Sequence, residues 1–246
     1  MKADPFAQLK LLDIQEIDSR ILQLRHRLAN LPETAEIDRL QATRKQLDDQ
    51  ARDARIVRDD LAAAQKKAEA DVEAVRTRRD REQQRIDAGA VTHAKDLERL
   101  QAEIANITRR IGVLEDEELE VMEQLETANA TVADLEAKLA DLDAQITELT
   151  TARAQRASGL EAELATVTAE RGPAVEGVPA DLMALYDRLR EQKGSGAAEL
   201  RRRECSGCML TLDPAELAQI RSAPSDQVVR HEECGRILVR TSESGL

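Results

Sequence analysis

The stretch LERLQAEIANITRRIGVLEDEELEVMEQLETANATVADLEAKLADLDAQITEL, residues 97–149, decides the fold of this chain. Its apolar residues recur at strictly alternating spacings of three and four, which is the heptad pattern of a coiled-coil seam. One charged residue, Glu118, interrupts the pattern. A helix with such a stripe needs a partner, because the stripe would otherwise stay in water. The seam consists of Leu97, Leu100, Ile104, Ile107, Ile111, Leu114, Glu118, Val121, Leu125, Ala128, Val132, Leu135, Leu139, Leu142, Ile146 and Leu149.

The partner helix is found upstream in the same chain. Between the two helices lies DAGAVTH, residues 87–93, where Gly89 is suited to end one helix and Thr92 to cap the next. The sequence therefore predicts an antiparallel coiled-coil hairpin with its tip near residues 88–93. The upstream seam has the same spacing with more alanine, and consists of Leu40, Leu47, Ala54, Val57, Leu61, Ala64, Ala68 and Val75.

Two proline-containing stretches divide the rest of the helical region. Pro32 lacks a backbone N–H and restricts the residue before it, so we expect a kink near residue 32. The apolar residues of 14–31 are again spaced by three and four, and should lie against residues 150–170. ERGPAVEGVPADL, residues 170–182, then marks a break. We assign residues 1–172 to the hairpin and residues 173–196 to a linker and a short amphipathic helix.

Charge is unevenly distributed along the hairpin. LEDEELEVMEQLE, residues 114–126, contains seven acids and no base. The segment expected across the hairpin contains Arg55, Arg58, Lys66 and Lys67. We predict that the two segments are complementary flanks of one coiled coil. The alternative is that the acidic run is a docking site for a partner.

The last part of the chain, residues 197–246, contains all three cysteines. Cys205-Ser-Gly-Cys208 is a knuckle that brings two thiolates onto one metal ion. LDPAELAQI, residues 212–220, begins with helix-start signals, which are Asp213 as the cap and Glu216 at the capping-box position. DQVVR, residues 226–230, and the apolar run at 237–239 are typical of strands.

A second pair of metal ligands follows at zinc-ribbon spacing. His231-Glu-Glu-Cys234 is separated from the first knuckle by 22 residues, and His231 stands where a thiolate is expected. We predict one structural Zn²⁺ held by Cys205, Cys208, His231 and Cys234, because three thiolates and one imidazole nitrogen satisfy a tetrahedral site. The alternative is an ordinary surface histidine in a module that has lost its metal. Zinc is preferred to iron for this ligand set.

Composition restricts the class of protein. One Tyr, one Phe and no Trp among 246 residues leave too little aromatic volume for one large globular core. A charged fraction of 34% is typical of long helices. No apolar run is long enough to span a bilayer, and the first residues carry acids where a signal peptide is apolar. We therefore expect a cytoplasmic protein that does not bind membranes.

Several motifs together resemble a known family. They are DAGAVTHAKDLERLQAEI at the tip, LEDEELEVME, LYDRLR, CSGC and VVRHEECGRILVR. Their order is similar to that of bacterial proteins that combine a coiled-coil hairpin with a C4-type zinc ribbon, and the actinobacterial members look closest. Relatives include the flagellar zinc-ribbon protein. The resemblance covers essentially the whole chain and implies a mostly α fold, zinc at the four positions named above, adaptor work and no catalysis. His231 departs from the cysteine that is usual at its position.

The sequence leaves three classes of function. The first is a non-enzymatic adaptor or chaperone-like protein that binds protein partners through the coiled coil and the ribbon. The second is an RNA- or DNA-binding regulator that uses the arginines of the ribbon. The third, an enzyme, is disfavoured because a catalytic zinc keeps an open coordination position. The seam is compatible with a monomer and with a homodimer. The candidate nucleic-acid or partner contacts are Arg201, Arg202, Arg203, Arg221, Arg230, Arg236 and Arg240.

Overall fold

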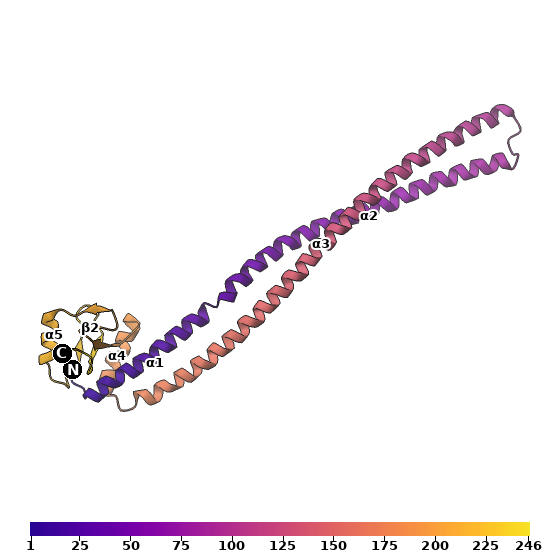
Figure 1. Cartoon of the computed structure of the whole chain (residues 1–246). Helices are drawn as coiled ribbons and strands as arrows, with labels where there is room; N and C mark the ends of the chain where they lie inside the picture. The colour runs from indigo at the N-terminus through magenta and orange to yellow at the C-terminus, as the bar shows by residue number, and fades with distance from the viewer. The chain divides into compact units, whose positions relative to one another are not determined.

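The computed structural model describes residues 1–246, and most of them are helical (Figure 1). The chain divides into two compact units. Unit 1 comprises Met1–Thr34 and Thr151–Leu246, and unit 2 comprises Ala35–Thr150. No helix is long and apolar enough to cross a membrane. The helices are α1 (Pro5–Ala29), α2 (Pro32–Asp87), α3 (Ala94–Val175), α4 (Ala180–Lys193) and α5 (Pro214–Ser222).

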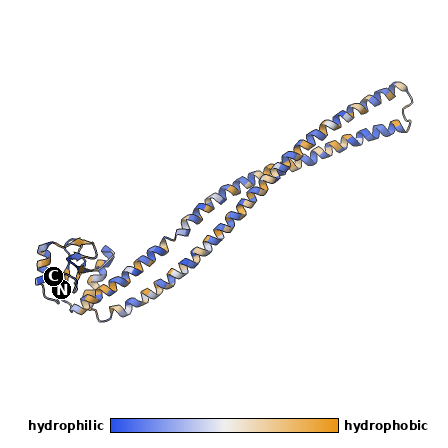
Figure 2. Ribbon diagram, in the orientation of Figure 1, coloured by the Kyte–Doolittle hydropathy of each residue, from blue (hydrophilic) through white to orange (hydrophobic).

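Unit 2 is an antiparallel helical hairpin of α2 and α3, as the heptad pattern predicts. Along α3 the buried seam residues include Leu100, Ile107 and Val132. The turn at the tip uses Gly89, whose φ of 64° is one that residues with a Cβ rarely adopt. The first helical bonds of α3 are accepted by the carbonyl of His93, so the cap position is one residue later than the sequence suggested. Figure 2 shows that the α2 arm close to the tip is mostly hydrophilic.

The seam of α2 differs from its prediction in the middle of the hairpin. Val57 was expected to face α3, but its exposed fraction is 54%. Ala51 and Val72, which the spacing did not select, are buried instead. The weak, alanine-rich pattern of α2 did not determine which residues face the partner helix.

The ion pairs of unit 2 also differ from the predicted ones. Arg55 pairs with Glu136 at 2.8 Å instead of with the acidic run 114–126. Within that run Glu115 pairs with Arg76, on the α2 segment nearer the tip. The run therefore forms no ion pair with Arg55, Arg58, Lys66 or Lys67, the bases that were predicted to complement it. Most of its acids have no ion-pair partner, and these are Asp116, Glu118, Glu120, Glu123 and Glu126.

Unit 1 begins with the packing of α1 against the last part of α3. Ile21 and Leu24 of α1 form a buried cluster with Leu160 and Val167 of α3, which confirms the expected pairing of residues 14–31 with residues 150–170. Helix α1 ends at Ala29 and α2 begins with a proline, so the break that proline chemistry predicts lies between them.

A five-stranded sheet forms the ribbon end of unit 1. Its strand order is β3-β2-β1-β5-β4, with β1 and β5 parallel and the other neighbours antiparallel. Successive side chains of a strand point to opposite faces, and β5 follows this rule. Ile237 and Val239 pack on α1 and α4, whereas Leu238 joins the cluster beside α5. The strands are β1 (Ala197–Arg201), β2 (Glu204–Cys205), β3 (Leu210–Thr211), β4 (Val229–Arg230) and β5 (Ile237–Arg240).

The N-terminal residues are joined to the ribbon, which the sequence did not indicate. The backbone N–H of Ala3 donates to the carbonyl of Asp226 at 2.7 Å, and the N–H of Val228 donates to the carbonyl of Met1 at 3.1 Å. Gln15 of α1 accepts the N–H of Gly196 at 2.8 Å. The ribbon therefore shares a core with the start of the chain.

A buried polar cluster connects α1, α3 and α4 within unit 1. The side chain of Asp18 is 2% exposed and accepts the hydroxyl proton of Tyr186 at 2.9 Å and the Nε–H of Arg171 at 2.8 Å. Arg190 contacts the same carboxylate at 3.4 Å. Burial, followed by the charge of Asp18, raises the pKa of Tyr186 well above its usual range. Tyr186 therefore has a packing role and stays protonated.

Gly196→Ala should destabilise unit 1. A Cβ on Gly196 would overlap the carbonyl oxygen of Tyr186 and lie 2.6 Å from its ring carbon Cδ2. Overpacking of this kind costs about 1–3 kcal/mol. The matched control is Gly159→Ala, in the helical part of the same unit, where a Cβ meets nothing within 4 Å. That change should stabilise the helix by about 0.5–1 kcal/mol. Urea unfolding of both variants measures the two shifts, and equal shifts would contradict the packing argument.

Candidate metal centre

The first pair of metal ligands lies on the turn that follows β2. The N–H groups of Cys208 and Met209 donate to the carbonyl of Cys205, at 3.3 Å and 2.8 Å, which closes a tight knuckle. Gly207 is required there, because a Cβ would lie 2.8 Å from Cδ of Arg236. The backbone thus brings both thiols to one side of the turn.

The second pair lies on the turn between β4 and β5. The N–H of Gly235 donates to the carbonyl of His231 at 2.8 Å, and Gly235 has a φ of 73°. His231 in turn donates its N–H to the carbonyl of Arg236 at 3.0 Å. This second knuckle faces the first, so four residues that are distant in sequence converge.

The four ligand atoms fit a tetrahedral zinc ion. One atom each from Cys205, Cys208, His231 and Cys234 lie within 4.8 Å of one another. The two sulfurs of Cys205 and Cys234 are 3.9 Å apart, and Nδ1 of His231 is 3.4 Å from the sulfur of Cys208 and 3.2 Å from that of Cys234. Zn–S bonds of ~2.3 Å and Zn–N bonds of ~2.0–2.1 Å place tetrahedral ligand atoms about 3.5–3.8 Å apart. The structure therefore brings together all four predicted ligands.

The thiols of the site differ in acidity. Burial raises the pKa of the Cys205 thiol to about 11. Burial acts in the same direction on Cys234, but hydrogen bonds from the backbone N–H of Arg236 and from the side chain of His231 lower its pKa to about 6. Zinc binding must therefore displace a proton from Cys205, whereas Cys234 already favours the thiolate at neutral pH.

Two family models match the chain in agreement with this geometry. The CT398-like coiled coil hairpin domain matches residues 14–194, and the C4-type zinc ribbon domain matches residues 205–238. The chain belongs to the CT398-like hairpin family. This confirms the resemblance seen in the sequence, and the ribbon at the end of the chain is a zinc ribbon with one structural metal site.

Relatives of this CT398-like protein match it over nearly its whole length. A protein of Mycobacterium tuberculosis strain H37Rv is 35% identical over 251 residues, which cover 98% of each chain. A solved structure from Mycobacterium smegmatis superimposes with a TM-score of 0.83 and 33% identity, over 98% of this chain and 100% of that one. CT398 of Chlamydia trachomatis has the same fold, with a TM-score of 0.64 and 19% identity, over 96% of this chain and 98% of that one.

His231 distinguishes this CT398-like chain from the C4 pattern of its ribbon model. The residue is 1% exposed, so it is not an ordinary surface histidine. Zinc with four thiolates has a formal charge of −2, whereas three thiolates and a neutral imidazole give −1. A bound zinc would hold the two knuckles together, and its four protein ligands are typical of structural sites.

Most of the seven candidate arginines of the ribbon already contact protein oxygens, so they do not form one basic face that is free to bind phosphates. Arg240 donates to the carbonyls of residues 220, 223, 224, 225 and 227, and so fixes the loop after α5. Arg201 pairs with Glu243 at 2.7 Å, and Arg230 donates to the carbonyl of Gly235. Arg203 and Arg236 likewise donate to nearby protein oxygens. Two of the seven have no such bond, and these are Arg202 and Arg221.

Sequence reasoning missed one residue beside the metal site. Glu216 was assigned to a capping box, but its Oε1 accepts the N–H of Glu232 at 2.9 Å, on the second knuckle. The cap itself is correct, because Asp213 accepts the N–H of Ala215 at 2.7 Å. The sequence contains one sign of this role, which is an acid in the first turn of a helix that starts between the two knuckles. A capping box explains the same acid equally well.

Proposed function

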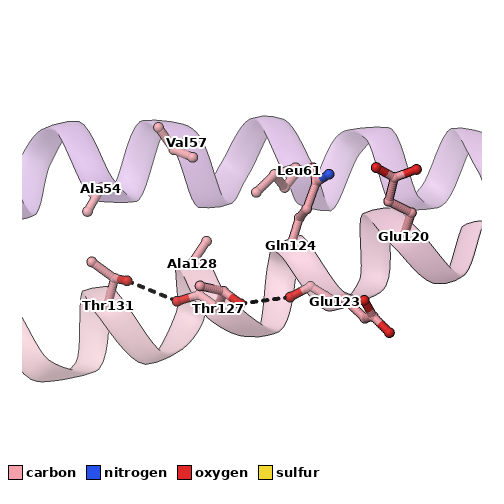
Figure 3. A pocket seen from close by; sticks show the side chains of 9 residues that line it. All are labelled: Ala54, Val57, Leu61, Glu120, Glu123, Gln124, Thr127, Ala128 and Thr131. Carbon is pink, nitrogen blue, oxygen red and sulfur yellow. Dashed lines mark hydrogen bonds between the residues drawn. The ribbon is translucent and has the colours of Figure 1, made fainter.

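We propose that the chain is a non-enzymatic zinc-binding adaptor that holds protein partners on its hairpin and ribbon. The observation that carries this proposal is an open groove between α2 and α3 in unit 2, with a volume of about 680 Å³. Figure 3 shows it, with Ala54, Val57 and Leu61 on one side. The α3 side consists of Glu120, Glu123, Gln124, Thr127, Ala128 and Thr131.

The groove exists because the seam is poorly filled at this height. Between Leu114 and Val132 no seam residue of α3 is fully buried. Small side chains, Ala54 and Ala128, point into the space between the two helices here, and Val57 is 54% exposed. Apolar groups that the hairpin leaves uncovered are available to a partner.

The groove is lined by apolar side chains and by two acids. The hydroxyls of Thr127 and Thr131 each donate to the carbonyl four residues earlier, both at 3.0 Å, so they are already satisfied. Glu120 and Glu123 have no ion-pair partner and line one end of the groove in Figure 3. An amphipathic helix with small apolar residues on one face and Lys or Arg on its flanks complements such a groove.

The closed metal site supports the non-enzymatic part of the proposal. A catalytic zinc usually has three protein ligands and keeps its fourth position for water or substrate. Here four side chains converge within 4.8 Å. In this proposal the zinc orders the ribbon, and the ordered ribbon is a second surface that binds partners.

Nucleic-acid binding by the ribbon has less support. Most of the arginines that could contact phosphates already donate to protein oxygens, and the chain has a net charge of −12. Phosphate binding depends on available cations and weakens steeply with salt. Nucleic-acid binding is therefore the second candidate function.

Val57→Glu should weaken partner binding, and Ile56→Glu should not. Both residues are exposed to the same degree, 54% and 55%, but Val57 lines the groove and Ile56 does not. An added acid on the floor would be desolvated by a bound helix. Proteins retained by the wild type from a lysate of the source organism are identified by mass spectrometry, produced separately, and titrated against all three chains. We expect a loss of about tenfold or more for Val57→Glu alone.

Two outcomes would contradict the proposal, the first for the groove as the binding surface and the second for the adaptor role as a whole. Equal affinity of all three chains for every retained protein would remove the groove from the function. Retention that disappears after nuclease treatment, together with direct binding of RNA or DNA that weakens steeply with salt, would favour the nucleic-acid reading.

A further inference from the structure

His231 is held between the metal site and one acidic side chain. Its Nδ1 faces the sulfurs of Cys208 and Cys234, at 3.4 Å and 3.2 Å. Its Nε2 lies 3.8 Å from Oε2 of Glu216. The two ring nitrogens therefore have different neighbours, which are thiols on one side and a carboxylate on the other.

Glu216 is unusually buried for an acid. Its exposed fraction is 6%, and acids are rarely buried to this extent unless they are paired. One oxygen accepts the N–H of Glu232 at 2.9 Å, and the other faces the imidazole. The nearby zinc site would be formally negative, so a carboxylate here needs a hydrogen-bond donor to offset the repulsion. Nε2 of His231 lies 3.8 Å from Oε2 of Glu216, which is longer than a hydrogen bond, so a small approach of the ring would make its N–H the donor.

We infer that Glu216 is a positioning residue for zinc. In the loaded site its carboxylate accepts the Nε2–H of His231 and selects the tautomer whose Nδ1 is free to bind the metal. Carboxylate partners of this kind orient metal-binding histidines in many proteins, and their loss typically lowers metal affinity 10–100-fold. Glu216 and His231 thus act as a pair, and the acid is what allows an imidazole to stand where the C4 pattern has a thiolate.

The pairing predicts opposite effects in two backgrounds. With His231 present, Glu216→Gln removes the carboxylate that orients the ring. With His231→Cys, the same acid has no donor and faces a site of formal charge −2, so Glu216→Gln relieves a repulsion. In both backgrounds glutamine keeps a side-chain oxygen for the N–H of Glu232. A weakening beside His231 that is absent or reversed beside Cys therefore reports on the imidazole contact alone.

The test is a double-mutant cycle on zinc affinity. Wild type, Glu216→Gln, His231→Cys and the double variant are purified without a histidine tag and titrated in competition with a chromophoric chelator. We expect Glu216→Gln to weaken zinc binding about tenfold beside His231, and to leave it unchanged or to strengthen it beside Cys. The control is Glu233→Gln, which removes the same charge next to Cys234 from an exposed residue and should change affinity less than twofold.

A spectroscopic readout separates positioning from folding. Nitrogen-15 spectra of the imidazoles in the zinc-loaded wild type should show Nδ1 of His231 bound to metal and Nε2 protonated, with the assignment made by His231→Cys. Two results would overturn the inference, whatever the fate of the adaptor proposal. One is metal on Nε2. The other is a change of the same sign, or no change, in both backgrounds of the cycle.

Discussion

Zinc removal, or His231→Ala, is expected to disorder the two knuckles while both helical hairpin arms remain folded. Structural zinc sites contribute an apparent free energy on the order of 10 kcal/mol or more, which is comparable to the stability of a whole domain. The cluster on the α5 side of the sheet includes Cys205 and is closed by Cys208 and Cys234, so it depends on the metal. The seam of unit 2 contains none of these residues.

The expected disorder has a sharp boundary within the sheet. Ile237 and Val239 of β5 pack on α1 and α4 and do not need the metal. Hydrogen exchange measured by mass spectrometry should therefore lose protection in residues 204–235 and retain it in 237–240, with most far-ultraviolet circular dichroism unchanged. His93→Ala, in the exposed tip, is the control. Loss of the helical signal together with the ribbon would contradict this separation.

Asp18→Ala should lower the stability of unit 1 by about 3–5 kcal/mol, which is the usual effect of removing one partner from a buried ion pair. The carboxylate is 2% exposed and meets two guanidinium groups and a phenol. Nε of Arg190 already lacks a hydrogen-bond partner. The other acid of the cluster, Asp187, already contacts Arg171 at 2.7 Å and Arg190 at 3.4 Å, so it would be the one carboxylate left for both. The variant would leave both Arg171 and Arg190 without this buried counter-charge.

The chain provides its own probe for that experiment. Tyr186 is the one tyrosine, and there is no tryptophan, so tyrosine fluorescence reports on the polar cluster alone. Urea unfolding followed at this signal should shift strongly for Asp18→Ala. Asp13→Ala, an exposed acid of the same helix, should change stability by less than about 0.5 kcal/mol. A small shift for both variants would show that the cluster does not stabilise unit 1.

The sequence predicted those features that repeat locally. The heptad spacing located α3 and its seam, and the glycine and proline positions located the tip and the break before Pro32, because steric rules act over a few residues. The four zinc ligands were found from their spacing and converge as expected. These signals are strong because a coiled coil requires the heptad spacing and a tetrahedral metal site requires four ligands at suitable spacing.

Features that depend on contacts between distant residues were missed. Nothing near Ala3 indicates a hydrogen bond to Asp226, and no periodic pattern marks Gln15 as an acceptor for the backbone before β1. The pairing of Arg55 with Glu136 depends on small shifts of register, which an alanine-rich seam specifies weakly. Glu216 was assigned to a local cap because the histidine that it faces is fifteen residues away in sequence.

The two parts of unit 1 are synthesised at different times, because they lie at opposite ends of the chain. Its core joins Leu11 and Ile14 to Ile237 and Val239, so the first helix is synthesised long before the strands that cover it. At about 5–20 residues per second, the nascent helix waits roughly 10–50 s with its apolar face exposed. Unit 2 is contiguous in sequence, so it can fold during that delay. Premature termination beyond the hairpin would therefore leave unit 2 folded, whereas the start of α1, at Leu11 and Ile14, would lack the strands that cover it and would be prone to aggregate.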